Sequence, residues 1–494
     1  MTSVTINRVF LASTRHFIPQ GASPRVPIAL RLVSHPKKYE RCRNYHVSRK
    51  KASSTATHVP QNGDNLMHGG SSSAPLSILP LSMVLRSLVT SAVSSSALLP
   101  LSLRIMGVLA NSANPLLNAD HNPILRYMLD KSLYAQFCAG ANPSEVQTTI
   151  AKLKDIGVTG VILAYAKEFP GEGQSELEES ASARPGEETQ SIINSEIAPW
   201  EESMRKTVRL VEPGDFAALK FTGAGQLAYY LLRHQLPPTP RLCELIDHIC
   251  RLAQERGVRL LFDGEQNVLQ DGIDAWTMHF ASRYNTTPGR ATIFGTYQAY
   301  KKTTPSLLSR HLAEAQKGGF TLGVKLVRGA YLGSDQRDLF FSRKSSTDSC
   351  YDNCAASVLT RHWNRTLEGI GEYPNVSLML ATHNATSVQR AYAIYNAGGA
   401  RCEVSFAQLQ GMADEISCEL VEVNHSARRN GDAAAAVSVL PVYKYMAWGT
   451  TGECMKYLFR RAQENRDAID RTRDDRNAMW TELVRRIKKT FRRS

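Results

Sequence analysis

Eight short runs rich in Val, Ile, Leu and Phe recur between residues 157 and 449, and most are followed by a longer segment with helical periodicity. Such alternation predicts parallel strands joined by helices, because a parallel connection needs a long crossover. Strands are expected over 157–166, 216–223, 259–265, 291–300, 321–331, 377–384, 401–409 and 441–449. Helices are expected over 241–256, 306–317, 351–367 and 386–397.

Eight such units are the number that closes a (β/α)8 barrel. The alternative architecture is an open doubly wound sheet, which needs a Gly-rich phosphate loop after its first strand. No G-x-G-x-x-G motif follows the run at 157–166. We therefore predict an α/β fold, a (β/α)8 TIM-type barrel over 133–470 with an N-terminal helical extension.

The two ends of the chain carry much of its formal charge of +14. The first 39 residues contain six Lys and Arg and no acid, a composition typical of a mitochondrial transit peptide, which we expect over 1–51. Residues 52–74 are rich in Ser, Gly, His and Asn and are expected to form a disordered linker. A basic helix is expected over 471–494. Because no basic face with interleaved aromatics lies between these ends, we expect no nucleic-acid partner.

The region 75–132 is expected to be helical, and its first part, 75–113, is apolar. Only 17 residues separate Arg86 from Arg104, and many of them are Ser or Thr, whereas a membrane span needs about 20 mainly apolar residues. An amphipathic helix or a helix that caps the core is therefore favoured over a spanning helix, and peripheral association with a membrane stays open. Further along, ten glutamates between Glu168 and Glu202 predict an acidic, mobile insertion at about 169–206.

The nine cysteines include no CxxC pair, and Cys350 and Cys354 are one helical turn apart. No histidine cluster accompanies them, so reduced, buried thiols are expected and no metal site.

Polar and aromatic residues follow the expected strands at the rim where a barrel binds ligands. They are Lys220, Asp263, Tyr297, Gln298, Lys325, Arg328, Tyr331, Thr382, His383 and Asn384, with Gly329 and Leu409 among them. The cations suit an extended anionic ligand, and Tyr297 and Tyr331 suit flat rings. Because neither a nucleophile elbow nor a cluster of two histidines and one carboxylate is present, a bound organic cofactor is expected to supply the reactivity.

The stretch 445–465 holds Tyr445, a glycine turn and a helical segment in which Tyr457, Arg460 and Arg461 share one face. Two adjacent guanidinium groups beside apolar residues favour a small carboxylate, which binds such groups in bidentate fashion. Taken alone, this stretch also fits a solvated basic helix end.

Seven strings, LKFTGAG, FDGEQ, TYQAY, VKLVRGAY, ATHN, QLQGM and YLFRRAQEN, resemble the proline dehydrogenase family in the order that family has them, from about Tyr134 to Asn465. The resemblance implies an FAD-dependent barrel that oxidises L-proline to 1-pyrroline-5-carboxylate, the first step of proline catabolism to glutamate. It also implies that electrons pass to a membrane quinone, and that the protein associates peripherally with the matrix side of the mitochondrial inner membrane.

The same resemblance assigns roles to residues. Arg460, Arg461 and Lys220 hold the proline carboxylate, while Tyr445, Tyr457 and Leu409 wall the ring. Asp263 orients Tyr445, and Glu168 is the candidate for an acid that gates the pocket. The residues implied to contact the flavin are Gln298, Lys325, Arg328, Gly329, Tyr331, Thr382, His383 and Asn384.

This sequence departs from the family pattern in two places. In VKLVRGAY the lysine and arginine stand in the reverse of the bacterial order, which makes Lys325 the cation nearest the flavin N5. Gly264 replaces the commoner alanine.

Three alternatives remain open at this point. A hydroxyproline dehydrogenase of the same family shares the motifs, although Tyr445 is expected to crowd a 4-hydroxyl group. A lyase on a barrel could use Lys220 or Lys325 to form a Schiff base. A catalytically inactive scaffold has no reason to keep the paired arginines and Lys220.

Overall fold

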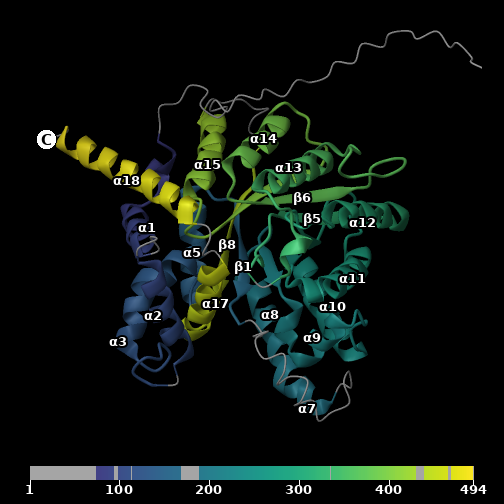
Figure 1. The fold of residues 1–494 in the computed structure, drawn as a ribbon, viewed down its shortest axis with the longest axis horizontal. Helices are drawn as coiled ribbons and strands as arrows, with labels where there is room; N and C mark the ends of the chain where they lie inside the picture. The colour runs from purple at the N-terminus through teal and green to yellow at the C-terminus, as the bar shows by residue number, and fades with distance from the viewer. Residues whose placement is uncertain are drawn as a thin grey trace, which may run out of the picture. The chain divides into compact units, whose positions relative to one another are not determined.

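The computed structural model describes residues 74–93, 98–112, 114–167, 189–333, 335–429, 439–464 and 469–492. Eight parallel strands pair in chain order and β1 also pairs with β8, so the sheet closes into a barrel (Figure 1). The strands are β1 (Gly160–Tyr165), β2 (Phe216–Leu219), β3 (Arg259–Phe262), β4 (Ile293–Gln298), β5 (Leu322–Val327), β6 (Val376–Ala381), β7 (Glu403–Leu409) and β8 (Val442–Trp448). The predicted (β/α)8 barrel is confirmed.

Helices follow the strands and surround the barrel, as Figure 1 shows. They are α8 (Ala198–Leu210), α9 (Gln226–Arg233), α10 (Pro240–Glu255), α11 (Asn267–Tyr284), α12 (Thr304–Gly318), α13 (Lys344–Thr360), α14 (Ala385–Asn396), α15 (Asp414–Arg429) and α17 (Thr451–Glu464). Local signals explain several ends. Thr239 accepts a hydrogen bond from the Leu242 N–H at the start of α10, and Pro240 fills the first helical position, where no N–H is needed.

Helix α13 lies earlier in the chain than the predicted 351–367. It begins at Lys344 and stops at Thr360, because Arg361 takes the left-handed conformation with φ of 51° and donates from Nη2 to the Tyr373 carbonyl at 2.8 Å. The earlier start matters for the site, since it places Asp348 on this helix.

Apolar side chains form two separate layers around the sheet. Inside the barrel lie Ile162, Phe216, Leu261, Phe294, Met379, Ala407 and Tyr443. The alternate residues of the same strands pack outward against the helices, for example Leu163, Leu260 and Leu380. This two-sided burial is the reason that the strands are almost continuously apolar in sequence.

The N-terminal extension is helical, as predicted. It contains η1 (Pro75–Ile78), α1 (Leu81–Val93), α2 (Leu99–Asn111) and α3 (Pro123–Leu129), while α18 (Ile469–Phe491) ends the chain. Helix α1 packs against α18, and α2 packs against α17. Among the described residues, no helix has the length and apolar character needed to cross a membrane.

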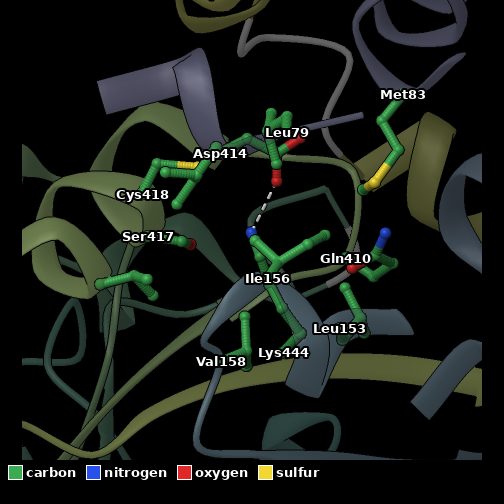
Figure 2. Close-up of a pocket in the computed structure, with 12 residues that line it drawn as sticks. Leu79, Met83, Leu153, Ile156, Val158, Gln410, Asp414, Ser417, Cys418 and Lys444 are labelled. Atoms are coloured by element: carbon green, nitrogen blue, oxygen red, sulfur yellow. Dashed lines mark hydrogen bonds and ion pairs between the residues drawn. The ribbon is translucent and has the colours of Figure 1, made fainter. Parts of the chain in front are cut away.

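Leu79 and Met83 of the extension cover a small apolar pocket on the outer side of the barrel, shown in Figure 2. Lys444 and Asp414 form a buried ion pair in its wall, with Nζ and Oδ1 2.7 Å apart. None of the predicted site residues lines this pocket, so we assign it to the packing interface between the extension and the barrel.

The expected acidic insertion is only partly described, because residues 168–188, including Glu168, lie outside the described part. The expectation of a mobile excursion is wrong for its end, since residues 198–206 belong to α8. Trp200, Met204 and Val208 of α8 are buried, and the Trp200 indole donates to the Lys220 carbonyl at 3.2 Å. The expected transit peptide (1–51) and nearly all of the linker (52–74) also lie outside the described residues.

Candidate active site

The strand pleat brings most of the predicted site residues to the carboxyl ends of the strands, at the mouth of the barrel. Successive side chains of a strand alternate between its two faces. Ala218, Leu261, Ala381, Ala407 and Tyr443 belong to the interior cluster or pack against it. Two positions further along the same strands, or just after them, come Lys220, Asp263, His383, Leu409 and Tyr445. The alternation thus carries a lysine, an acid, a histidine and a tyrosine from four strands towards one rim.

Asp263 binds both Lys325 of β5 and Tyr445 of β8. Its Oδ1 accepts from the Lys325 Nζ at 2.6 Å, and its Oδ2 accepts from the Tyr445 hydroxyl at 2.8 Å. Asp263 and Lys325 are 6% and 7% exposed, so each charge depends on the other for compensation. The Lys325 Nζ also lies 5.3 Å from the centre of the Tyr445 ring. The ring of Tyr445 is therefore held between β5, β3 and β8.

Tyr457 is the meeting point of two cations from different elements. The Lys220 Nζ, after β2, lies 5.9 Å from the ring centre, and the Arg461 Cζ lies 5.6 Å from it. Arg460 precedes Arg461 on α17, and both side chains are half-buried. This concentration of positive charge on one side of the rim favours an anionic ligand group.

His383 and Leu409 are joined across β6 and β7. The Leu409 backbone N–H donates to the His383 Nε2 at 3.1 Å. The Nε2 atom is therefore an acceptor, and a neutral His383 carries its proton on Nδ1.

Gln298 has the features of a ligand-binding amide. Its Nε2 donates to the Gln270 Oε1 at 3.1 Å, and the Gln270 Nε2 donates to the Asp274 Oδ1 at 2.9 Å. This chain fixes the orientation of the amide. The Gln298 Oε1 atom is buried and has no hydrogen-bond partner among the described residues. A buried acceptor of this kind fits a ligand N–H, such as the N3–H of a flavin, so the site fits the cofactor that the motifs imply.

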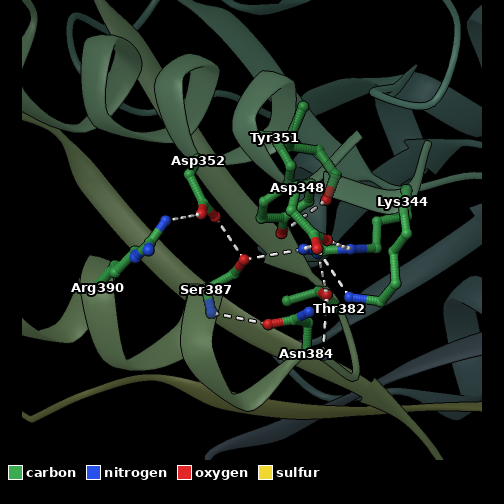
Figure 3. A network of polar contacts seen from close by, with 10 residues as sticks. Lys344, Asp348, Tyr351, Asp352, Thr382, Asn384, Ser387 and Arg390 are labelled. Carbon is green, nitrogen blue, oxygen red and sulfur yellow. Dashed lines mark hydrogen bonds and ion pairs between the residues drawn. The ribbon is translucent and has the colours of Figure 1, made fainter. Parts of the chain in front are cut away.

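Arg328 is held by protein side chains, among them Asp348 and Thr382, which belong to the polar network in Figure 3. It donates to Asp348 from Nε at 3.2 Å and from Nη2 at 2.8 Å, and to the Thr382 hydroxyl from Nη1 at 2.7 Å. Its guanidinium group lies 4.5 Å from the Tyr351 ring centre. The structure therefore separates Arg328 from Lys325 and places it between β5, α13 and β6.

Thr382 and Asn384 belong to the same outer network. The Thr382 hydroxyl accepts from the Asn384 N–H at 3.1 Å, and the Asn384 side chain accepts from the Ser387 N–H at 3.0 Å, which caps α14. The Ser387 hydroxyl donates in turn to Asp352 of α13. Asp348, Asp352 and Ser387 were not predicted, because their positions on helices carry no signal apart from this tertiary contact.

Gly329 and Tyr331 pack around Tyr300. Gly329 has φ of 140°, and a Cβ atom there would lie 2.1 Å from the Tyr300 ring, so only glycine fits. The Tyr331 N–H donates to the Tyr300 hydroxyl, and the Tyr331 hydroxyl donates to the Gly264 carbonyl, both at 3.3 Å.

Two further residues correct or extend the sequence predictions. Tyr297 does not offer its ring to a ligand, since it is 2% exposed and its hydroxyl lies 2.9 Å from the His311 Nδ1 in the outer core. Burial lowers the pKa of His311 to about 4.

Glu265 was not predicted as a site residue, yet it is buried and accepts from the Thr222 N–H at 3.3 Å, which fixes the turn after Lys220.

A larger pocket of about 950 Å³, counting its opening to solvent, lies beside α17. Its lining is mainly apolar and includes Leu99 and Met106 of α2, Phe137, Leu458 and Arg461. Arg461 is thus common to the pocket and to the group around Tyr457.

Comparison with known proteins places this chain in a family. The family model described as "Proline dehydrogenase" matches residues 146–474. A protein named probable proline dehydrogenase, mitochondrial, from Schizosaccharomyces pombe is 27% identical over 417 residues, which is 74% of this chain and 81% of that protein. A protein named hydroxyproline dehydrogenase from Bos taurus is 28% identical, over 73% of this chain and 82% of its own length.

A second set of relatives matches over a shorter region. Proline dehydrogenase 1, mitochondrial, of Caenorhabditis elegans is 32% identical over 48% of this chain and 37% of its own length. Among solved structures, proline utilization A from Bdellovibrio bacteriovorus aligns with a TM-score of 0.55 and 16% identity, over 81% of this chain and 40% of that chain. That structural likeness concerns the barrel fold alone. Since the family model covers well over half of the 494 residues, the chain belongs to the proline dehydrogenase family, whose members are oxidoreductases.

Proposed function

We propose that this protein oxidises L-proline to 1-pyrroline-5-carboxylate with bound FAD and passes the electrons to a membrane quinone. The observation that carries the proposal is the Tyr445–Asp263–Lys325 group, which lies on the same rim as the cations around Tyr457. One side of the rim is rigid and aromatic, and the other is cationic. A small cyclic amino acid has a ring and a carboxylate that match these two sides.

Arg460, Arg461 and Lys220 are proposed to bind the substrate carboxylate. Charge-assisted hydrogen bonds to a carboxylate are roughly twice as strong as neutral ones, and a guanidinium fork also fixes orientation. Holding the carboxylate fixes the ring relative to the cofactor, which is a positioning contribution to catalysis. Asp263 is committed to Lys325 and Tyr445, so we infer that solvent takes the proton of the substrate amine.

Tyr445, Tyr457 and Leu409 are proposed to wall the substrate ring. The hydrogen bond to Asp263 holds the Tyr445 ring in place and leaves little freedom to move away from a 4-hydroxyl group. This favours proline over hydroxyproline. Oxidation of hydroxyproline remains the second candidate function, because relatives named hydroxyproline dehydrogenase match about three quarters of the chain.

FAD is proposed to be held at the rim by Gln298, Lys325 and His383, with Gly329 and Tyr331 beside them. When bound, it supplies the acceptor for the electrons removed from the substrate. The positive charge of Lys325 favours negative charge at the cofactor edge. Arg328, Thr382 and Asn384 are proposed to act further out, because their side chains bind Asp348 and the start of α14.

The quinone, the membrane and the mitochondrion are also part of the proposal. The pocket beside α17 is apolar and shares Arg461 with the rim, which suits a lipophilic acceptor. Helix α2 leaves Leu101, Ile105 and Val108 more than half exposed at helical spacing. Relatives named mitochondrial and the leader at 1–39, which contains no acid, support a mitochondrial location, and we propose the matrix side of the inner membrane within it.

The absorbance spectrum of the purified protein, with and without L-proline, tests this proposal. A flavin spectrum that bleaches when proline is added under anaerobic conditions is the expected result. A colourless protein that borohydride traps with a substrate through Lys220 or Lys325 would instead identify a Schiff-base lyase. A flavin bleached by 4-hydroxyproline and not by proline would establish the second candidate.

A further inference from the structure

Helix α18 carries an apolar stripe on its outer face. Trp480, Ile487 and Phe491 are 60%, 47% and 78% exposed, and the partly buried Val484 lies between them. The spacing of i, i+4, i+7 and i+11 places all four side chains on one side of the helix. Large apolar side chains aligned in this way on a surface mark a binding face rather than scattered exposure.

The opposite face of α18 attaches the helix to the rest of the protein. Met479 is 3% exposed and belongs to the core, and Glu482 is 2% exposed and accepts hydrogen bonds from Arg485 and Arg486. The Arg486 Nη2 also donates to the carbonyl oxygens of Leu76 and Leu79 at 3.0 and 2.8 Å. The stripe therefore faces outward because the inner face is already used, and Figure 1 shows α18 running past α1 to the C-terminus, away from the barrel.

Cations border the stripe. Lys488 and Arg492 are exposed, lie one turn apart, and follow the helix on the side next to Ile487 and Phe491. Arg485 and Arg486 are not included among these bordering cations, because both form ion pairs with Glu482. No acid occurs after Glu482 in the sequence. A helix with aromatic and aliphatic side chains on one face and lysine and arginine beside them is the pattern of an interfacial helix on an anionic lipid surface.

We propose that α18 lies in the surface of an anionic bilayer and inserts Trp480, Ile487 and Phe491 between the lipids. The stripe spans roughly 16 Å, about half of the hydrocarbon thickness, so the helix lies on the membrane and does not cross it. The neighbouring helix α1 leaves Leu81, Leu85 and Val89 exposed at 48%, 44% and 59%, which gives the bilayer a second apolar contact from the other end of the chain. Pairing of two copies through the stripe is less favoured, since it would place the cations that border one stripe near those that border the other.

Flotation of the full-length protein with vesicles tests the proposal. We expect binding to vesicles of phosphatidylcholine with phosphatidylglycerol, and much weaker binding to phosphatidylcholine alone. The double variant Ile487→Ser/Phe491→Ser should bind about a hundredfold less, because each buried side chain contributes at least about 1.5 kcal/mol. Lys488→Gln/Arg492→Gln should bind roughly thirtyfold less to the anionic vesicles, at about 1 kcal/mol for each cation.

Matched variants control for general effects of surface apolarity and charge. Ile370→Ser/Leu236→Ser removes two exposed apolar residues elsewhere, and Lys317→Gln/Arg365→Gln removes two exposed cations elsewhere. Both should bind vesicles like the unaltered protein. Proline-dependent reduction of a soluble dye should be the same in all these variants, so the lipid result stands or fails apart from the proposed enzymatic function.

Three results would overturn the proposal. One is equal binding to neutral and anionic vesicles, which would leave no role for Lys488 and Arg492. Another is unchanged binding of Ile487→Ser/Phe491→Ser. The third is a dimer in solution that this variant dissociates while vesicle binding is absent, which would identify the stripe as a contact between two copies of the chain.

Discussion

The Tyr445 hydroxyl on β8 donates to the Asp263 carboxylate after β3 at 2.8 Å, and the other oxygen of that carboxylate accepts from Lys325 on β5. One acid thus links three strands of the barrel. It compensates a buried cation and holds an aromatic ring at the same time. The proposed role of Tyr445 in substrate recognition is therefore coupled to stability at this position.

Asp263→Asn should destabilise the protein, because it leaves the Lys325 charge buried without its counter-ion. Loss of one partner of a buried pair costs about 3–5 kcal/mol. The double variant Asp263→Asn/Lys325→Met should recover a large part of that loss, since no buried charge remains. Urea unfolding of Asp263→Asn, Lys325→Met and the double variant measures this. Additive losses in the double variant would show that the two groups do not interact.

Tyr445→Ser should raise the preference for 4-hydroxyproline over proline. The serine side chain is smaller and places a hydroxyl near the substrate C4, so a 4-hydroxyl group gains both space and a polar neighbour. A change of this kind alters the ratio of the two kcat/KM values by roughly 1–3 kcal/mol. Tyr445→Phe keeps the ring and serves as the control for size. A ratio that stays the same in Tyr445→Ser would remove Tyr445 from the C4 side of the pocket.

Arg460→Met and Arg461→Met should each weaken the apparent affinity for proline by roughly ten- to several-hundredfold, because a hydrogen bond to a charged group is worth about 1.5–3 kcal/mol and each 1.4 kcal/mol is tenfold. Pyrrolidine lacks the carboxylate and should be nearly insensitive to these changes. Steady-state kinetics with both substrates provides the comparison. Equal losses for proline and pyrrolidine would assign the arginines to the fold or to the cofactor site.

Gln298→Met should weaken retention of the flavin by up to about tenfold, because the buried Oε1 acceptor is lost and a neutral hydrogen bond is worth about 0.5–1.5 kcal/mol. The exposed Gln254 donates to the Tyr284 carbonyl, and Gln254→Met is the matched control. Titration of the apoprotein with FAD, followed by flavin fluorescence, gives both dissociation constants. If the two variants retain FAD equally well, Gln298 is a structural amide.

Acid should destabilise the barrel through His311, which faces the Tyr297 hydroxyl and is 5% exposed. Burial, and to a smaller extent Arg310, lowers the pKa of His311 from 6.5 to about 4. Between these values the unfolded state binds more protons, so stability falls as the pH drops from 6.5 towards 4, by at most about 3 kcal/mol. Thermal melts from pH 7 to pH 4 should show a shallower decline for His311→Gln. Parallel curves for the variant and the unaltered protein would contradict this assignment.

The sequence alone determined the barrel and the strand ends that form its rim. Eight apolar runs with helical segments between them leave few other closed arrangements, and the positions of Lys220, Asp263, Gln298 and Lys325 at the ends of those runs predict that they lie on the ligand-binding rim. The shared face of Tyr457, Arg460 and Arg461 on α17 was likewise visible, because residues three and four apart lie together on any helix. These inferences depend on local geometry, which a sequence carries directly.

Only the tertiary structure decided which of the rim residues contact one another. Arg328 looks equivalent to Lys325 in the string VKLVRGAY, yet an odd separation of three positions turns it to the opposite face of β5, where Asp348 of α13 binds it. Tyr297 and Gln298 are adjacent, and the same pleat sends the tyrosine to His311 and the glutamine to the mouth of the barrel. The stripe on α18 was part of a basic helix in the sequence, and it became an outer surface only because Glu482 and Arg486 bind the opposite end of the chain. Contacts between side chains of different strands and helices depend on how the elements pack around the closed sheet, and no local pattern encodes that packing.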